Sequence, residues 1–154
     1  NTFNNSGVYN QPYMIQKVTN TSGDLLADKS SFGLESKQIM SASTASTMWD
    51  LMRQVVTSGT GSSAATTQAT AGKTGTTDNE ENLWFTGMTG NLTTSIWVGN
   101  LEYEVVGAGS YIPAGIYGTY MQTLLNNNEV AQFAPDNVPV TQDVTPSYTA
   151  PESQ

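Results

Sequence analysis

The chain has 154 residues and a mass of 16.4 kDa, which is the length of one ordinary domain. Only 37% of its residues are hydrophobic and 12% are charged, and the formal net charge is −8. Five scattered basic residues cannot form the positive patch that binds a phosphate backbone, which excludes nucleic acid as a partner. Because the apolar content is low, we expect either partial disorder or a core shared with a larger domain.

The sequence also lacks two chemically important residue types, cysteine and histidine. Their absence excludes disulfides, thiolate metal sites, zinc catalysis and any Ser-His-Asp arrangement within this chain. We expect no metal and no cofactor. No apolar run approaches the roughly 18–20 residues that span a bilayer, and the first residues lack a signal-peptide pattern. Abundant Thr, Ser and Asn without Cys suit an exported bacterial protein.

The first forty residues predict a helix end and a hairpin. Thr2–Gly7 closes with Asn, Ser and Gly, which is typical of the end of a helix and suggests a chain cut out of a larger domain. Tyr13–Val18 has strand propensity, and the turn residues 20–24 precede a returning strand at Leu25–Ala27. We interpret this hairpin as an ordinary surface feature without chemistry.

A first amphipathic helix is predicted after residue 40, capped by Ser41 or Ser43 and ended by Gly59 and Gly61. Its apolar residues follow a helical spacing of i, i+3, i+4, i+7 and i+8, which predicts one buried face. These residues are Met48, Leu51, Met52, Val55 and Val56. The Ser/Ala/Thr/Gln-rich residues 62–70 predict a loop.

The second half of the chain predicts an antiparallel meander followed by a helix. Strands at 83–88 and 93–98 flank Gly90-Asn91 and join the strand around Lys73 in a three-stranded sheet. Pro113 suits the first turn of the second helix. Its expected apolar stripe is Ile116, Tyr120, Met121, Leu124 and Leu125. From Phe133 onward the chain is Pro-containing and polar, which predicts an extended or disordered tail.

The stretch Ala71–Thr77 carries the chain's best-placed cation between two glycines, which indicates an anion site. A phosphate-binding loop is disfavoured because its first glycine would fall at Thr67, and because a polar loop precedes the Lys and hairpins follow it. On an edge strand, Thr74 and Thr76 would share one face, where their hydroxyls could bind a carboxylate, while Lys73 lies on the other. A free backbone N–H there could stabilise an oxyanion. A plain strand without a ligand remains the alternative.

With its flanking residues this stretch resembles the C-terminal part of the transpeptidase domain of a class A penicillin-binding protein. The resemblance covers roughly residues 1–125 in the right order. It rests on Ala71–Thr77 together with Asn82–Gly87 and Ile96–Gly99, and on the segments 2–9, 12–15, 49–61 and 113–121.

The resemblance implies an α+β fold, with the antiparallel meander packed with helices as part of a serine β-lactamase/transpeptidase-like domain. It implies that Lys73 is catalytic and that the backbone N–H of Thr76 forms half of the oxyanion hole. It further implies that Thr74, Gly75, Thr76 and Thr77 bind the substrate or the β-lactam carboxylate. The activity would be acyl transfer from a D-Ala-D-Ala stem peptide through a serine ester, which β-lactams intercept.

The chain departs from the family pattern in lacking two of its three motifs. The positions three before Lys17, Lys29, Lys37 and Lys73 hold no serine, so Ser-x-x-Lys is absent, and Ser-x-Asn is absent too. We therefore expect residues 1–125 to be one piece of a transpeptidase domain that folds against a second piece carrying the serine, with 126–154 as a tail.

An upstream glycosyltransferase domain and membrane anchor would place the chain on the extracellular face of a bacterial membrane. The alternatives are a noncatalytic carboxylate- or peptide-binding module and a β-lactamase-like hydrolase.

Overall fold

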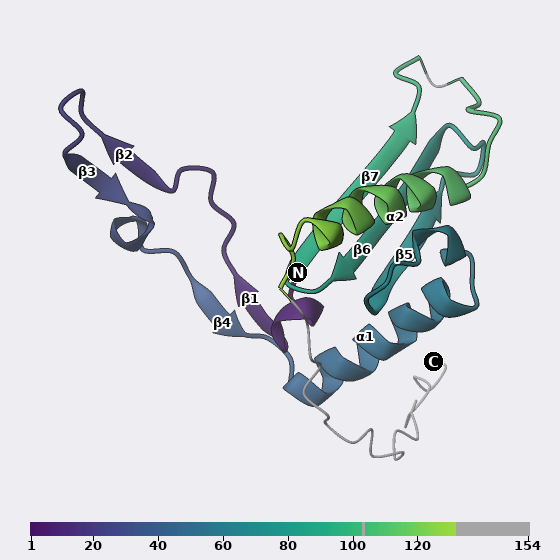
Figure 1. Ribbon diagram of the computed structural model, residues 1–154, viewed down its shortest axis with the longest axis horizontal. Coiled ribbons are helices and arrows are strands. Elements are labelled where there is room, and N and C mark those ends of the chain that lie inside the picture. Colours follow the sequence, from purple (N-terminus) through teal and green to yellow (C-terminus); the bar gives the residue numbers. More distant parts are fainter. Residues whose placement is uncertain (103, 132–154) are drawn as a thin grey trace, which may run out of the picture.

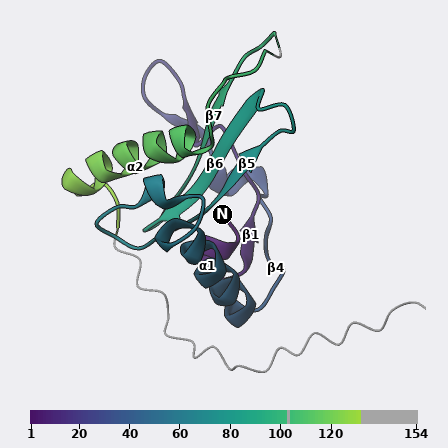
Figure 2. The same ribbon diagram turned by 90° about the vertical axis from the view of Figure 1, so that its right-hand side faces the viewer.

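The computed structural model describes residues 1–102 and 104–131. Its body is a three-stranded antiparallel sheet of β5 (Thr70–Thr76), β6 (Asn82–Thr89) and β7 (Leu92–Gly99), in the order β5-β6-β7. Figures 1 and 2 show helix α2 (Tyr111–Asn126) lying across one face of this sheet, while α1 (Ala42–Thr57) packs against β5. The predicted meander and the α+β class are confirmed. Within the described residues β5 is an edge strand, because β6 is its one partner in the sheet.

A narrow arm projects from this body (Figure 1). In it β1 (Val8–Asn10) pairs with β4 (Ser36–Gln38), and β2 (Lys17–Thr19) pairs with β3 (Leu25–Asp28). The predicted helix end at the start of the chain is confirmed as a short 3₁₀ helix, Phe3–Asn5, which precedes the arm.

The predicted hairpin of the arm is confirmed, but its first strand is shorter than expected. Residues 13–16 form no strand, and pairing starts at Lys17 opposite Asp28. The next residues after Asp28 turn into the 3₁₀ helix Lys29–Phe32, whose N-cap is Asp28 itself. No extended segment is therefore left for residues 13–16 to pair with, which is why strand propensity alone overestimated the length of this strand.

Helix α1 begins after Ser41, whose Oγ accepts a hydrogen bond from the backbone N–H of Thr44 at 3.1 Å. Its buried face differs from the predicted stripe, because Leu51 is 52% exposed. The buried residues of the helix are Ala45, Trp49 and Val56, and Met52 packs against the cluster that contains Trp49. The prediction followed the aliphatic and Met residues and left out Trp49, which packs against β5 and β6 at Ala71 and Met88 and so sets how the helix is turned about its axis.

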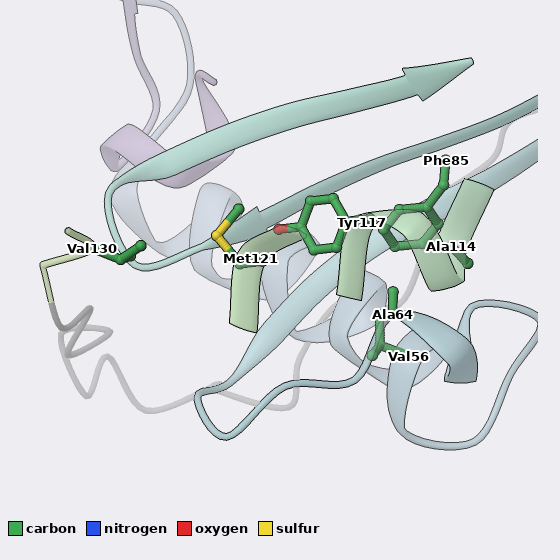
Figure 3. Packing of buried hydrophobic residues seen from close by; sticks show 7 residues of the cluster. All are labelled: Val56, Ala64, Phe85, Ala114, Tyr117, Met121 and Val130. Atoms are coloured by element: carbon green, nitrogen blue, oxygen red, sulfur yellow. The ribbon is translucent and has the colours of Figure 1, made fainter. Parts of the chain in front are cut away.

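The main core lies between α2 and the sheet (Figure 3). Phe85 of β6 and Tyr117 of α2 meet edge to face with ring centroids 5.0 Å apart. The other buried members of this cluster are Val56, Ala64, Ala114, Met121 and Val130.

The predicted stripe on α2 is only partly correct. Met121 is buried, and Leu124 and Leu125 pack against the cluster, but Ile116 and Tyr120 are 45% and 46% exposed. The sequence pattern overlooked the small residues Ala114 and Gly118, which let the 3₁₀ helix Ser62–Ala64 approach α2 closely.

The chain continues to pack against the body after α2 ends. Val130 is buried in the main core, and the backbone N–H of Ala131 donates to Asn91 Oδ1 at 3.1 Å. The rest of the tail expected for residues 126–154, from residue 132 onward, lies outside the described residues, as does Tyr103.

We predict that two glycines of α2 respond oppositely to alanine. A Cβ at Gly118 would lie 2.8 Å from the backbone oxygen of Ser63, a contact that only a backbone shift can relieve. The Gly118→Ala variant should therefore lose about 1–3 kcal/mol of stability. A Cβ at Gly115 would meet Ser63 Cβ at an ordinary 3.9 Å, so Gly115→Ala should gain about 0.5–1 kcal/mol from reduced backbone entropy. Thermal unfolding of both variants checks this, and a Gly118→Ala variant as stable as the parent would contradict it.

We also predict an alkaline loss of stability that arises from Tyr117. Burial raises the pKa of its phenol to about 12 from the ordinary 10, only partly offset by the hydrogen bond with Thr89 at 3.0 Å. Because the pKa is higher in the folded state, stability is unaffected below pH 10. Between pH 10 and 12 the Tyr117 phenol ionises in the unfolded chain but not in the folded one, which favours unfolding. The free energy of unfolding should fall by up to about 2–3 kcal/mol between pH 10 and 12. Urea unfolding across this range measures it, and Tyr117→Phe should lack this part of the decline.

Candidate functional site

The strand β5 is anchored at its start and open at its end. Thr70, Ala71 and Gly72 are buried, whereas Lys73 and Thr76 are exposed. Gly72 is required by close packing, since a Cβ there would lie 2.4 Å from Phe85 Cζ. The core therefore fixes the first half of the strand, and the second half carries its polar groups at the surface.

The hydrogen-bond ladder determines which backbone groups face away from the sheet. The backbone N–H of Thr77 donates to the Asn82 carbonyl at 3.1 Å, and these two residues continue the β5–β6 register. In an antiparallel pair the bonded positions alternate along the strand, so Gly75 and Lys73 also bond toward β6. The N–H and C=O groups of Thr74 and Thr76 therefore point to the open edge. An outward N–H at Thr76 is compatible with the oxyanion role expected of it, which stays a prediction.

The Lys73 ammonium folds back onto this same edge. Its Nζ donates to the Thr74 carbonyl oxygen at 2.8 Å and lies 3.4 Å from Thr74 Oγ1. Within the described residues Lys73 forms no ion pair; the one that is present joins Arg53 to Asp50 at 3.5 Å on α1. The remaining basic residues, Lys17, Lys29 and Lys37, belong to the arm. Lys73 is thus the one cation of the described part of the sheet, and it has capacity for an anion.

A hydroxyl pair completes the edge and includes a residue that the sequence analysis did not single out. Thr60 Oγ1 lies 2.7 Å from Thr74 Oγ1, where it reaches the strand from the loop after α1. Thr60 lies between Gly59 and Gly61 inside a segment that carries the family resemblance, but that pattern does not distinguish it from its neighbours. Sequence alone gave no reason to place this loop beside β5.

The remaining two predicted site residues have different surroundings. Gly75 is half-buried on the face of Trp84, where an added Cβ would meet Trp84 Cβ at 3.3 Å. Thr77 Oγ1 accepts the backbone N–H of Asn82 at 3.1 Å and so holds the turn between β5 and β6. The structure therefore gathers Lys73, Thr74 and Thr76 at one open edge, with Thr77 holding the adjoining turn.

The described residues contain no group of three or more His, Cys, Asp or Glu side chains that could hold a metal ion. Among the helices in that same part of the chain, none has the length and apolar character to cross a membrane. The chemistry of this edge consists of one ammonium, two neighbouring hydroxyls and outward N–H groups, all of which suit an anionic oxygen ligand.

Comparison with known proteins identifies the family. The family model described as penicillin binding protein transpeptidase domain matches residues 1–116. The chain is 34% identical over 122 residues to penicillin-binding protein 1A of Clostridium acetobutylicum, covering 78% of this chain and 15% of the relative. It is 30% identical over 144 residues to penicillin-binding protein 1A of Aquifex aeolicus, covering 90% and 19%. The chain thus spans less than a fifth of the length of these relatives.

Solved structures show the same fold. The crystal structure of penicillin-binding protein 1A from Haemophilus influenzae is similar with a TM-score of 0.69 at 21% identity, over 86% of this chain and 26% of that one. A penicillin-binding protein from Mycobacterium tuberculosis gives 0.71 at 23% identity, over 86% and 38%. The matched family model and these relatives establish that the chain belongs to the transpeptidase domain family of class A penicillin-binding proteins.

Proposed function

We propose that this chain supplies the Lys-Thr-Gly strand of a D,D-transpeptidase site whose serine nucleophile lies on another segment of the same domain. The observation that carries the proposal is the open edge of β5, where Lys73, the Thr74 hydroxyl and the outward N–H of Thr76 converge. The absence of Ser-x-x-Lys and Ser-x-Asn from the sequence supports a nucleophile elsewhere.

In the proposed reaction the serine Oγ attacks the penultimate D-Ala carbonyl carbon of a stem peptide. The carbonyl oxygen becomes an oxyanion, which the N–H of Thr76 and the N–H of the serine itself stabilise. The C–N bond then breaks and D-Ala leaves with a proton, which leaves an ester on the serine. An amine of a second stem peptide attacks that ester, forms the cross-link and returns the proton to the serine.

The charged edge would bind the free carboxylate of the D-Ala terminus. The hydroxyls of Thr74 and Thr76 donate to it, and the nearby ammonium of Lys73 strengthens that attraction. The same ammonium, placed beside the serine, would favour the movement of its proton. A β-lactam carries an equivalent carboxylate next to its reactive amide, so the same strand would bind it, with Gly75 allowing close approach and Thr77 holding the turn.

For the organisation of the whole protein we propose that residues 1–125 are the C-terminal portion of the transpeptidase domain and that 126–154 form an extension. The partner is then the remainder of the domain, with stem peptides and β-lactams as ligands. A glycosyltransferase domain and a membrane anchor would belong to other parts of the protein. Peptidoglycan cross-linking places this segment on the extracellular face of the bacterial membrane.

One prediction of the proposed function concerns covalent labelling by a penicillin. Intact mass spectrometry of the protein containing this chain should show the gain of one penicillin mass, because ring opening adds the whole molecule to the serine. After proteolysis the adduct should lie on a peptide outside residues 1–154. No adduct on any segment would favour a noncatalytic binding module, and rapid loss of the adduct would favour a β-lactamase-like hydrolase.

A further prediction of the proposed function separates the effect of the Lys73 ammonium from the effect of general charge. Lys73→Met keeps an unbranched side chain that matches the four-carbon stem of lysine but removes the cation, so the rate of penicillin acylation should fall by about 100-fold or more. Lys37→Met removes an exposed cation from β4 on the arm and serves as the matched control, with an unchanged rate. Stopped-flow acylation with a fluorescent penicillin measures both. Equal rates for Lys73→Met and the parent protein would contradict the assigned role.

A further inference from the structure

The loop that follows α1 is held in place by the core. The backbone N–H groups of Gly59 and Gly61 both donate to the carbonyl of Val55, at 3.1 and 3.0 Å. A Cβ at Gly61 would lie 3.0 Å from Phe85 Cε2, and a Cβ at Gly59 would lie 2.9 Å from the Val55 backbone. The loop therefore lies too close to the helix end and the core to accept larger residues on either side of Thr60. Thr60 itself is exposed, and its position is fixed by its neighbours.

This fixed loop brings the Thr60 hydroxyl to Thr74. The two oxygens are 2.7 Å apart, a normal hydrogen-bond length for two hydroxyls. Lys73 Nζ approaches the same Thr74 oxygen at 3.4 Å. The Thr74 hydroxyl thus has two polar neighbours within the described chain before any ligand binds.

Counting protons shows what Thr60 does to Thr74. A hydroxyl has one proton and two lone pairs, and an ammonium can only donate. If Thr74 gave its proton to Thr60, it would present lone pairs to an incoming carboxylate and repel it. If Thr60 donates instead, Thr60 and Lys73 occupy the acceptor positions of Thr74. Its one proton is then left for the ligand.

We propose that Thr60 is a positioning residue that donates to Thr74 Oγ1 and thereby fixes Thr74 as the hydrogen-bond donor to the carboxylate of the acyl donor. The inference rests on the proposed function, because it assigns this role within the same site. Thr60 acts through Thr74, so its contribution belongs to the binding of the carboxylate and not to the bond-breaking step.

The test uses the complete protein and separates penicillin binding from acylation by the dependence of the acylation rate on penicillin concentration. Thr60→Val keeps the shape of the side chain but removes its proton. It should raise the dissociation constant of the non-covalent complex by about 3- to 10-fold, while the limiting acylation rate changes less than about twofold. Thr60→Ser restores the hydroxyl and should return the dissociation constant to within about twofold of the parent value.

Two controls separate this role from a structural one. The methyl ester of the same penicillin lacks the anionic carboxylate, so Thr60→Val and the parent protein should bind it equally. Ser43→Ala breaks another exposed hydroxyl pair, with Ser41 at 2.9 Å, at the start of α1 and so at the end of that helix opposite to the Thr60 loop, and it should leave penicillin binding unchanged. Thermal unfolding of each variant establishes that it is folded.

The inference is overturned if Thr60→Val binds penicillin as tightly as the parent, or if Thr60→Ser fails to restore binding. It is also overturned if Thr60→Val weakens binding of the methyl ester by the same factor as binding of the penicillin. A parent protein that no penicillin acylates is a different result. It overturns the proposed function itself and the role of Thr60 with it.

Discussion

The close packing of Phe85 against Tyr117 is the constraint on which the rest of the structure depends. A Cβ on Gly72 or Gly87 would come within 2.4 or 2.6 Å of these rings, and one on Gly61 within 3.0 Å. Because these two rings lie so close, β5, β6 and the loop after α1 each need a glycine where they contact them. All three segments therefore pack against the same part of the core. In two of them, β5 and the loop, the glycine is the direct neighbour in sequence of a polar residue of the site, Lys73 or Thr60.

This arrangement explains how a chain with a small apolar fraction holds a defined site. Residues 73–76 of β5 are not themselves members of the buried clusters, so the polar edge takes its position from residues one or two places along the chain. Gly72 precedes Lys73, and Gly61 follows Thr60. Short backbone connections to a rigid core are an efficient way to position side chains, because few torsions separate them from packed atoms. The arm, by contrast, has several large apolar residues at the surface, among them Ile15, Leu25 and Leu26.

Much of the fold could be predicted from the sequence, because the elements near the site carry strong local signals. The strand segments on either side of Gly90-Asn91 identified the meander, and Ser41 or Ser43 marked the start of α1, of which the structure uses Ser41. The faces of the two helices were harder to predict. Burial there is decided by Trp49 and by the small residues Ala114 and Gly118, to which a search for aliphatic stripes gives little weight. The length of β2 depends on whether a partner strand continues past Asp28, and this is decided by strand pairing in the folded chain and not by local propensity.

For the site, too, residues that are close in sequence could be predicted, whereas a residue brought in by tertiary packing could not. Strand periodicity put Thr74 and Thr76 on one face and Lys73 on the other. The structure differs for Lys73, because its long side chain reaches round the strand and brings the ammonium to the Thr74 carbonyl and hydroxyl oxygens. Thr60 is fourteen positions away from Thr74, and its approach depends on how α1 ends and how its loop packs on Phe85. No local pattern encodes such a contact, and only the folded chain reveals it.

The register of the β5–β6 pairing limits how this segment can change in sequence and length among related proteins. Outward and inward backbone groups exchange places at each step along a strand, so a slip of one residue between β5 and β6 would turn the N–H of Thr76 into the sheet. It would leave the composition and the hydrophobic content of the strand unchanged. A change of one side chain at this edge therefore leaves the strand pairing intact, whereas insertions and deletions in the turn at residues 77–81 are tolerated only where the turn absorbs them without moving the pairing of Thr77 with Asn82. The turn is thus the part of the site in which a change of length is more damaging than a change of residue.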